Sequence, residues 1–409
     1  MKILLATFWI VPHVGGVWSY MQQLKANLEF LGHEVDLLGH GGSEKSVKIV
    51  NKNQEIFKDQ LQSLISSKVR EERHRFFDKD GVIRHYEHLR IGYELGVAHL
   101  GLEEYDLIHT QDVLSAACIN LIRPQKTPLI ATIHGSVAHE LKHYVTNILK
   151  SPTSNLACMY FDELEHRGAT SAEFTIVANN WLKNILINEF HVPNEQLKVF
   201  HYGYDIENFL KRMNEQSSLQ PPTDKKLIIY TGRLTEIKGV HYLISALSEL
   251  KKIRTDWICW IVGDGDMQEK LQAQNEALGL EKEVLFLGSR NDVPYLLSVS
   301  DICILPSIID NQPLAVIEAQ LAAKPVIVSD AGGLPEMVDH GITGVISPAG
   351  DPKMLCINID YLLQHEEYRN NLGLNAKRWA LNYWSPNIAV QNVINTYEKA
   401  ILKRQNTSN

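Results

Sequence analysis

The chain has 409 residues, a formal net charge of −8 and a pI near 6.1. A single hydrophobic core rarely extends over such a length, so we expect two domains. The acidic balance argues against nucleic-acid binding as the main function. A hydrophobic content of 44% with 22% charged residues is typical of an ordinary globular protein.

Cysteine usage and the N-terminal run indicate the compartment. The five cysteines are scattered without a CxxC pair, which predicts free thiols in a reducing environment and no zinc site. Met1–Pro12 is a short apolar run that continues into a glycine pair and a helical pattern, so we expect a first strand rather than a signal peptide. No stretch approaches 18 apolar residues. We therefore expect a cytoplasmic protein without a membrane span.

The first half alternates strand and helix patterns. A helical pattern over Val17–Leu31 ends at Gly32, a typical helix stop. Strands are predicted at Ile3–Thr7, Glu34–Leu38, Leu107–His109, Leu129–Ile133, Phe174–Val177 and Leu197–Phe200. Strands that alternate with helices predict a parallel, doubly wound sheet.

The segment Glu44–Arg90 interrupts this alternation. It is rich in Lys, Arg, Glu and Gln and includes REERHR at Arg70–Arg75. Our interpretation is an amphipathic helical insertion with a solvated face. The alternative is a basic helix that contacts an acceptor or an anionic membrane surface at the inner face, although the interspersed acids weigh against it.

The second half restarts the alternation after Gln216–Asp224, which has a linker's composition. Helices are predicted over Val240–Lys251 and Met267–Leu278. Strands are predicted at Leu227–Tyr230, Trp257–Val262, Val284–Leu287, Ile302–Leu305 and Val326–Val328. A last helix follows Ser385-Pro386 and runs to about Ile401. This pattern predicts a second α/β domain, with a ligand cleft between the two.

Two features of the first half are candidate ligand contacts. Gly15 and Gly16 follow the first strand and open the first helix, where glycines let backbone N–H groups approach a phosphate. Their spacing is not G-x-G-x-x-G, and a simple tight turn is the alternative. His134 ends the strand Leu129–Ile133, where it could donate to a sugar hydroxyl, cap a helix or pack in a core. The histidines form no HxxxH or HExxH pattern, so we expect no metal site.

The second half contains candidate diphosphate ligands. Arg233 and Lys238 follow a strand in TGRLTEIKGV, where two cations would neutralise a departing diphosphate. A pair of surface cations is the alternative. Asp264-Gly265-Asp266 has the D-x-D form of some metal-dependent transferases. It lies between a strand and a helix, so turn and N-cap roles are favoured.

Two acids, Asp310 and Glu318, are separated by seven residues in PSIIDNQPLAVIEAQLAAKPVIVSDAGG. Asp310 is predicted to lie in a loop after a strand, and a helix is predicted to start at Pro313 and Leu314. Carboxylates accept hydrogen bonds from sugar and ribose hydroxyls, and a helix start offers free N–H groups to phosphate. The pair is therefore suited to a nucleotide-linked sugar, unless both acids are merely solvated.

In this order, the motifs resemble those of the family 4 glycosyltransferases, which have the GT-B architecture. The resemblance covers nearly the whole chain. It comprises the glycine pair with GVWSYMQQLKANLEFLGHEV, TIHG, FHYGYDIENF, YTGRLTEIKG, IVGDGDMQEKL, LFLGSRNDV, ILPS, the acid-x7-acid segment and AGGLPEMVDHGITG. It implies two Rossmann-like domains that face each other across a cleft. The acceptor domain would comprise residues 1–205 and 385–409, and the nucleotide-sugar domain residues 206–384.

The resemblance also implies roles for the donor phosphates and the leaving group. Gly16, beside Gly15, would approach the phosphates. Arg233 and Lys238 would bind the diphosphate and stabilise it as it leaves. Leu314 and Ala315 would add backbone groups to the sugar and phosphate cradle.

For the sugar, ribose and base, the resemblance implies four further contacts. Asp310 would hold hydroxyls of the donor sugar, and Glu318 those of the ribose. His134 would contact the sugar near the reacting carbon. Arg290 would contact the base.

Three positions depart from the family pattern. Asp310 stands where Glu is usual, and Pro313 where many members have glycine. The junction motif is YGYD at Tyr202–Asp205 instead of N-G-V-D. These departures bear on the identity of the donor sugar more than on the class of reaction.

The implied activity is retaining, metal-independent transfer of a sugar from a nucleotide-sugar, usually a UDP-sugar, to an acceptor hydroxyl, with no cofactor. The acceptor would be a sugar, a lipid-linked molecule or a small molecule, and the reaction would belong to glycoconjugate or cell-envelope polysaccharide synthesis. The alternatives are a nucleotide-sugar epimerase, a sugar phosphorylase, or an inactive relative that acts as a binding or coat component.

Overall fold

The computed structural model describes residues 1–13, 15–72, 75–215 and 217–408, and it contains two compact units. Unit 1 comprises Met1–Tyr202 and Ala389–Asn409, and unit 2 comprises Gly203–Ile388. The chain therefore leaves unit 1 after Tyr202 and returns to it through its last helix. Each unit is described separately below.

Unit 1 is built on a sheet that has eight strands in the described residues, in the order β4-β3-β2-β1-β5-β6-β7-β8. The strands are β1 (Lys2–Ile10), β2 (Glu34–His40), β3 (Ser46–Ile49), β4 (Gln54–Phe57), β5 (Leu107–Thr110), β6 (Leu129–Ile133), β7 (Phe174–Val177) and β8 (Leu197–Val199). From β2 through β1 to β8 all neighbours are parallel. The sheet extends to both sides of β1, which confirms the predicted doubly wound α/β fold.

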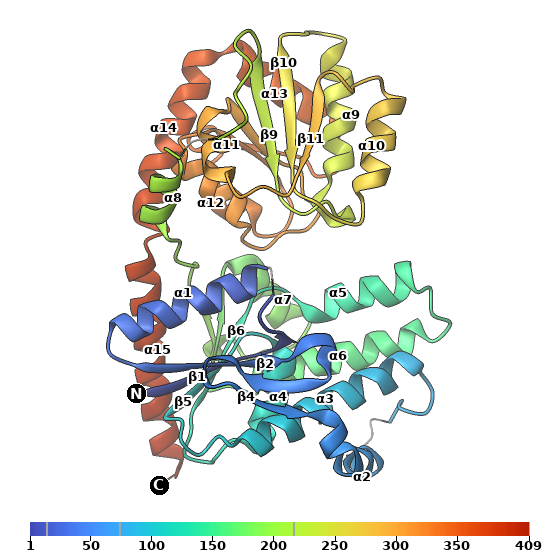
Figure 1. Cartoon of the computed structure of the whole chain (residues 1–409), viewed down its shortest axis with the longest axis vertical. Helices are drawn as coiled ribbons and strands as arrows, with labels where there is room; N and C mark the ends of the chain where they lie inside the picture. Colours follow the sequence, from blue (N-terminus) through green and yellow to red (C-terminus); the bar gives the residue numbers. More distant parts are fainter. Residues whose placement is uncertain (14, 73–74, 216, 409) are drawn as a thin grey trace. The chain divides into compact units, whose positions relative to one another are not determined.

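The helices of unit 1 are α1 (Gly16–Phe30), α2 (Gln62–Glu72), α3 (Gly81–Leu100), α4 (Val113–Ile122), α5 (Val137–His143), α6 (Ser154–Thr170), α7 (Asn180–Asn188) and α15 (Pro386–Ser408), most of which are visible in Figure 1. Successive strand residues point to opposite faces. Leu4 and Ala6 of β1 join the core with α3, α4 and α6. Ile3 and Leu5 join the core with α1 and α15. The unit is therefore a three-layer α/β/α structure.

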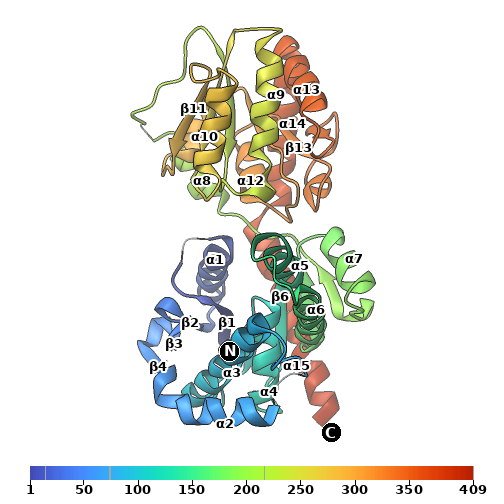
Figure 2. The ribbon, with the colours of Figure 1, turned by 90° about the vertical axis from the view of Figure 1, so that its right-hand side faces the viewer.

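The predicted helical insertion is only partly correct. Its first part forms β3 and β4, which extend the sheet as antiparallel strands beyond β2. Helices α2 and α3 follow (Figure 2). Alternating residues such as Val47 and Ile49 are buried, so the period-two pattern outweighs the charged composition in this part. In the REERHR segment, Arg73 and His74 lie outside the described residues, and Arg75 pairs with Glu163 of α6.

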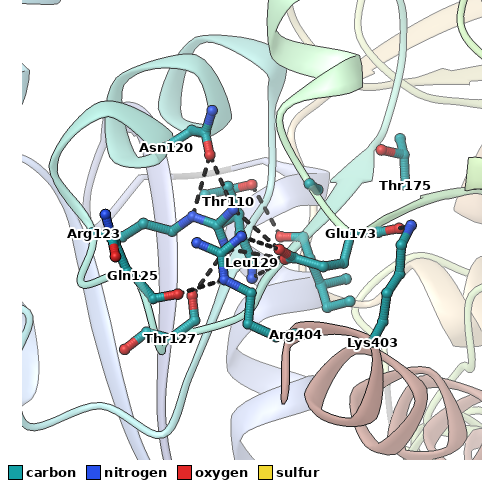
Figure 3. A network of polar contacts seen from close by, with 12 residues as sticks. Thr110, Asn120, Arg123, Gln125, Thr127, Leu129, Glu173, Thr175, Lys403 and Arg404 are labelled. Atoms are coloured by element: carbon teal, nitrogen blue, oxygen red, sulfur yellow. Dashed lines mark hydrogen bonds and ion pairs between the residues drawn. The ribbon is translucent and has the colours of Figure 1, made fainter. Parts of the chain in front are cut away.

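A buried carboxylate anchors α15 to the sheet of unit 1 (Figure 3). Glu173, 8% exposed, precedes β7 and accepts hydrogen bonds from Arg123 at 3.0 and 3.1 Å and from Arg404 of α15 at 3.2 Å. Its Oε2 also accepts from the N–H of Leu129 at 2.6 Å. Lys403 donates to its backbone carbonyl at 3.1 Å. These charge-assisted bonds supplement the apolar contact of α15.

Unit 2 contains a parallel sheet of six strands in the part of the chain that the structure describes, in the order β11-β10-β9-β12-β13-β14. The strands are β9 (Lys226–Thr231), β10 (Trp257–Val262), β11 (Val284–Gly288), β12 (Ile302–Leu305), β13 (Val326–Ser329) and β14 (Gly344–Ser347). The helices are α8 (Ile206–Arg212), α9 (Val240–Lys251), α10 (Gln268–Ala277), α11 (Val293–Val299), α12 (Leu314–Leu321), α13 (Pro352–Gln364) and α14 (Glu366–Tyr383).

The two faces of this sheet are covered by different helices. One core joins Ile228 and Tyr230 of β9 with α9, α10 and α13. The other joins Leu227 and Ile229 with α8, α11 and α12. Unit 2 is a second three-layer α/β structure. None of the helices in the described ranges of either unit is long and apolar enough to cross a bilayer.

Candidate functional site

In unit 2 the strand order reverses between β9 and β12. The chain continues from β9 to β10 on one side, whereas β12 pairs with β9 on the other through Ile302 and Ile228. Loops that follow parallel strands diverge at such a point and leave room for a ligand at the carboxyl ends. The predicted residues Arg233, Lys238 and Asp310 all lie in these loops.

Lys238 and Asp310 form a partly buried ion pair. The Nζ atom of Lys238 lies 2.6 Å from Oδ2 of Asp310, and the side chains are 15% and 11% exposed. Ser307 donates to the same oxygen at 3.1 Å, and the N–H of Asn311 donates to Oδ1 at 3.2 Å. The pairing orients both groups, and it partly neutralises the cation that the sequence assigned to a diphosphate.

Two glycines allow this arrangement. Gly239 has φ +67°, and a Cβ there would lie 2.0 Å from the carbonyl oxygen of Pro306. Gly332 has φ +65°, and a Cβ there would lie 2.0 Å from the carbonyl oxygen of Asp310. The N–H of Gly333 donates to that carbonyl at 2.8 Å. The loops carrying Lys238 and Asp310 are thus held by close backbone contacts that a side chain would prevent.

Glu318 lies on α12 and is contacted by a residue that the sequence did not assign a role. The hydroxyl of Tyr204 donates to its Oε1 at 2.7 Å. Burial raises the pKa of Glu318, and the hydrogen bond from Tyr204 and the charge of Arg212 act in the opposite direction. The other carboxylate oxygen, Oε2, has the acceptor capacity that ribose hydroxyls require.

The start of α12 supplies backbone donors, as predicted. Leu314 and Ala315 are its first two residues after Pro313, so their N–H groups have no acceptor within the helix. Just before them, Gln312 is 7% exposed, and both polar atoms of its amide are buried without a hydrogen-bond partner. A buried amide without partners is costly, which is consistent with a ligand-binding loop.

Two predicted cationic contacts differ in their surroundings. Arg233 is exposed, and its backbone carbonyl accepts a hydrogen bond from the hydroxyl of Tyr230 at 2.8 Å. Arg290 makes a bidentate pair with Asp292, with both distances 2.7 Å, and Asp292 also accepts from Ser217. Arg290 is therefore oriented by Asp292, while Arg233 is held by its backbone.

The D-x-D motif forms a turn, in line with its expected structural role. The backbone carbonyl of Asp264 accepts from the N–H of Leu234 at 2.7 Å, and its carboxylate accepts from Ser289 at 2.7 Å. A Cβ at Gly265 would lie 2.4 Å from the carbonyl oxygen of Leu234. In the described ranges, no group of three His, Cys, Asp or Glu residues is arranged to hold a metal ion.

In unit 1, His134 follows β6 and belongs to a polar and aromatic cluster. The hydroxyl of Tyr202 lies 2.6 Å from its Nδ1, and Oε1 of Gln111 lies 3.1 Å from its Nε2. The rings of Tyr20 and Tyr202 lie 5.0 Å from the imidazole. Burial lowers the pKa of His134 to about 3, so the ring is neutral at physiological pH. Because an amide oxygen only accepts, Nε2 carries the proton and Nδ1 accepts from Tyr202.

The glycine pair lies at the start of α1. Gly15 is the N-cap with an extended backbone, and a Cβ there would lie 3.0 Å from the ring of His13. Gly16 is the first helical residue, and a Cβ there would have no neighbour within 4 Å. No atom of the described residues therefore fills the space on the Cβ side of Gly16.

Sequence reasoning missed Tyr202, Tyr204 and Gln111 as partners of predicted site residues. A signal for the two tyrosines was present, because both are departures in the YGYD motif. Gln111 follows β5, and its proximity to His134 depends on the pairing of β5 with β6. That pairing is a property of the sheet rather than of a local motif.

Two family models match the chain. The model described as Glycosyltransferase Family 4 matches residues 14–208, and the model described as Glycosyl transferases group 1 matches residues 211–379. The chain is also 26% identical over 411 residues to an uncharacterized glycosyltransferase of Methanocaldococcus jannaschii. That alignment covers 98% of this chain and 99% of the relative.

Solved structures give the same fold. HepE of Anabaena in complex with UDP superposes with a TM-score of 0.69 and 21% identity, covering 98% of this chain and 100% of HepE. Sucrose-phosphate synthase of Thermosynechococcus elongatus superposes with a TM-score of 0.71 and 18% identity, covering 98% and 99%. These likenesses confirm the GT-B fold expected from the sequence.

Proposed function

The chain belongs to glycosyltransferase family 4, and on that premise we propose that it moves a sugar from a UDP-sugar to an acceptor hydroxyl. We further propose that the reaction retains the anomeric configuration and needs no metal ion. The observation that carries the proposal is the Lys238–Asp310 pair at the point where the strand order of unit 2 reverses.

UDP is proposed as the donor nucleotide for two reasons. HepE has been solved with UDP and with UDP-glucose. In unit 2, a carboxylate on α12 and cations in the neighbouring loops suit a ribose followed by a diphosphate.

Within unit 2 we assign a role to each predicted residue. Glu318 accepts from the ribose hydroxyls, and Arg290 contacts the base. Lys238 and Arg233 bind the diphosphate, and the free N–H groups of Leu314 and Ala315 bind phosphate or sugar oxygens.

Asp310 is assigned to the hydroxyls of the donor sugar. It is one methylene shorter than the usual Glu, and Lys238, Ser307 and Asn311 already contact its oxygens. A sugar hydroxyl that donates a hydrogen bond to Asp310 must therefore approach the remaining lone pairs of its oxygens. This requirement restricts the positions that the hydroxyls of the donor sugar can take.

In unit 1 we assign His134 to a contact with the donor sugar and Gly15 and Gly16 to the phosphates. His134 is neutral and its ring nitrogens are engaged by Tyr202 and Gln111. Its role is then to position the sugar and to present its backbone carbonyl, rather than to transfer a proton.

In the proposed reaction the acceptor hydroxyl attacks the anomeric carbon from the face that the diphosphate leaves. The bond between the anomeric carbon and the phosphate oxygen breaks, and the bond to the acceptor oxygen forms. The acceptor proton passes to the departing phosphate oxygen, so no protein base is required. Lys238 and Arg233 stabilise the charge that develops on the diphosphate, which replaces the contribution of a metal ion.

We place the reaction at the cytoplasmic side, in the synthesis of a glycoconjugate or cell-envelope polysaccharide. Thermal unfolding with UDP, GDP and ADP tests the donor, since a ligand at a hundred times its dissociation constant adds about 2.7 kcal/mol of stability. NMR of the product tests retention, and turnover in the presence of a chelator tests metal independence. Stabilisation by GDP or ADP but not by UDP would overturn the donor assignment.

A further inference from the structure

The residue at which the chain leaves unit 1 is hydrogen-bonded to His134. Unit 1 ends at Tyr202, and unit 2 begins at the next residue, Gly203. The hydroxyl of Tyr202 lies 2.6 Å from Nδ1 of His134, although the two residues are 68 positions apart in the chain. The start of the connection between the units is therefore tied directly to a residue that we assign to the donor sugar.

Gln111 determines which nitrogen of the His134 ring carries the proton. Its Nε2 donates to the carbonyl oxygen of His109 at 3.4 Å, which orients the amide and turns Oε1 toward His134. Because Oε1 only accepts, Nε2 of His134, at 3.1 Å, carries the proton. Nδ1 then has a lone pair, to which the hydroxyl of Tyr202 donates. With both nitrogens engaged, the ring is held in one orientation and one tautomer.

Two aromatic rings pack around the imidazole of His134. The ring centroids of Tyr20, on α1, and of Tyr202 each lie 5.0 Å from that of the imidazole, and they lie 5.1 Å from each other. Phenylalanine in place of Tyr202 would keep these ring contacts and remove only the hydroxyl. The contribution of the hydrogen bond can therefore be separated from the contribution of the packing.

A second histidine fixes the strands beneath His134. Nδ1 of His109, on β5, lies 2.7 Å from the hydroxyl of Tyr397 on α15, and its Nε2 lies 2.7 Å from the hydroxyl of Thr132 on β6. All three side chains are fully buried. Burial lowers the pKa of His109 to about 3, so this ring is neutral and both of its nitrogens have a partner. Strand β6 therefore ends on a rigid polar network, and His134 is the first residue beyond it.

The backbone after His134 has little steric restraint. Apart from its chain neighbours, a Cβ at Gly135 would meet a single atom of the described residues within 4 Å, which is Oε1 of Glu140 at 3.7 Å. Glycine also has a wider choice of backbone angles than other residues. The hydrogen bonds of the His134 ring, rather than crowding at Gly135, therefore restrain the peptide group between the two residues.

We propose that Tyr202 is a positioning residue for sugar transfer that acts through His134. Its hydroxyl holds the imidazole in one orientation and thereby fixes the backbone carbonyl of His134, which is assigned to the donor sugar. Tyr202 takes up no proton and forms no covalent bond in the reaction. This role rests on the proposed function, and it depends on one of the residues by which the YGYD motif departs from the family pattern.

The first test measures the release of UDP from UDP-glucose, UDP-galactose and UDP-N-acetylglucosamine, with water as the acceptor. We expect Tyr202→Phe to lower kcat about tenfold or more, because a misplaced contact near the reacting carbon slows the chemical step. The affinity for UDP, measured calorimetrically, should not change. Tyr144→Phe, which removes an exposed hydroxyl of the same unit, is the matched control and should keep the wild-type kcat. Equal kcat in wild type and Tyr202→Phe would overturn the proposal.

The second test observes His134 directly, by nitrogen NMR of protein labelled at its histidines. His134→Gln identifies the resonances of this ring by their disappearance. In Tyr202→Phe the Nδ1 resonance should move toward that of an imidazole nitrogen without a hydrogen-bond partner, whereas Tyr144→Phe should leave it in place. An unchanged Nδ1 resonance in Tyr202→Phe would show that the tyrosine does not hold the ring.

Two further outcomes separate the alternatives. If Tyr202 had only a structural role, Tyr202→Phe would lower the melting temperature while kcat per mole of bound UDP stayed at the wild-type value. If wild type released no UDP from any of the three donors but the Nδ1 resonance still shifted in Tyr202→Phe, the proposed function would be refuted. The assignment of Tyr202 as the residue that orients His134 would then still hold.

Discussion

Replacing Tyr204 with phenylalanine isolates one hydroxyl group next to the predicted ribose contact. The ring of Tyr204 packs in the core of unit 2 and lies edge-on to Phe209, with ring centroids 5.9 Å apart. Phenylalanine keeps this packing and removes only the 2.7 Å hydrogen bond to Oε1 of Glu318. The change therefore tests whether that bond orients Glu318 for the nucleotide.

The expected magnitude follows from the character of the bond. A hydrogen bond to a charged group contributes about 1.5–3 kcal/mol. The side chain of Glu318 is only half-buried, so we take the lower end of this range of free energies. That value corresponds to about a tenfold loss of UDP affinity. The turnover at saturating donor should change much less than KM, since the ribose is remote from the reacting bond.

The pH dependence of UDP affinity provides a second, independent test of the role of Tyr204. Burial raises the pKa of Glu318, while Tyr204 and then Arg212 lower it, and Cys303 also lies near the carboxylate. Without the tyrosine hydroxyl the pKa rises further. Glu318 accepts ribose hydrogen bonds best when ionised, so UDP affinity should decline with falling pH, and the decline should begin at a higher pH in Tyr204→Phe.

Calorimetric titration with UDP between pH 5 and 8 measures both effects. Tyr361→Phe, which removes an exposed hydroxyl on α13 of the same unit, is the control. Wild-type affinity and an unshifted pH profile in Tyr204→Phe would show that Tyr204 does not orient Glu318 for ligand binding.

Three further changes test other parts of the structure. Lys238→Ala should lower turnover about a hundredfold; near-normal turnover at saturating donor would contradict its role. Asp310→Asn should abolish transfer yet preserve or strengthen UDP binding, because it releases Lys238 from its 2.6 Å pair; calorimetry beside a transfer assay checks both. Burial raises the pKa of Glu165 in unit 1 to about 8. The folding stability that is present while this carboxyl is protonated, at low pH, is therefore lost as the pH rises through 8. The melting temperature should therefore fall between pH 5 and 9 in wild type and fall less in Glu165→Gln. An identical fall in both proteins would refute this role of Glu165.

Local sequence patterns were sufficient to predict the repeating strand–helix order. Apolar runs such as Ile302–Leu305 and Val326–Val328 correspond closely to β12 and β13, because buried parallel strands are apolar on both faces. Helix α12 begins at Leu314 after Pro313, as predicted. The charged composition after Glu44 was misleading, since the short strands β3 and β4 are apolar mainly on one face.

The candidate site was only partly visible in the sequence. Lys238 and Asp310 were singled out from separate motifs, but their ion pair depends on how β9 and β12 pair. The hydrogen bond from Tyr204 to Glu318 joins residues 114 positions apart. Such contacts depend on the approach of distant segments, which local propensity does not encode.

The sequence by itself determined the class of fold, the family and the types of side chain available to bind a nucleotide-sugar, because hydrophobic periodicity and motif order are local properties. Only the tertiary structure decided which of these side chains meet. It paired Asp310 with Lys238 and brought the hydroxyl of Tyr204 to the carboxylate of Glu318. The physical reason is that hydrogen bonds and ion pairs act over a few ångströms, so they depend on strand order and loop geometry rather than on position along the chain.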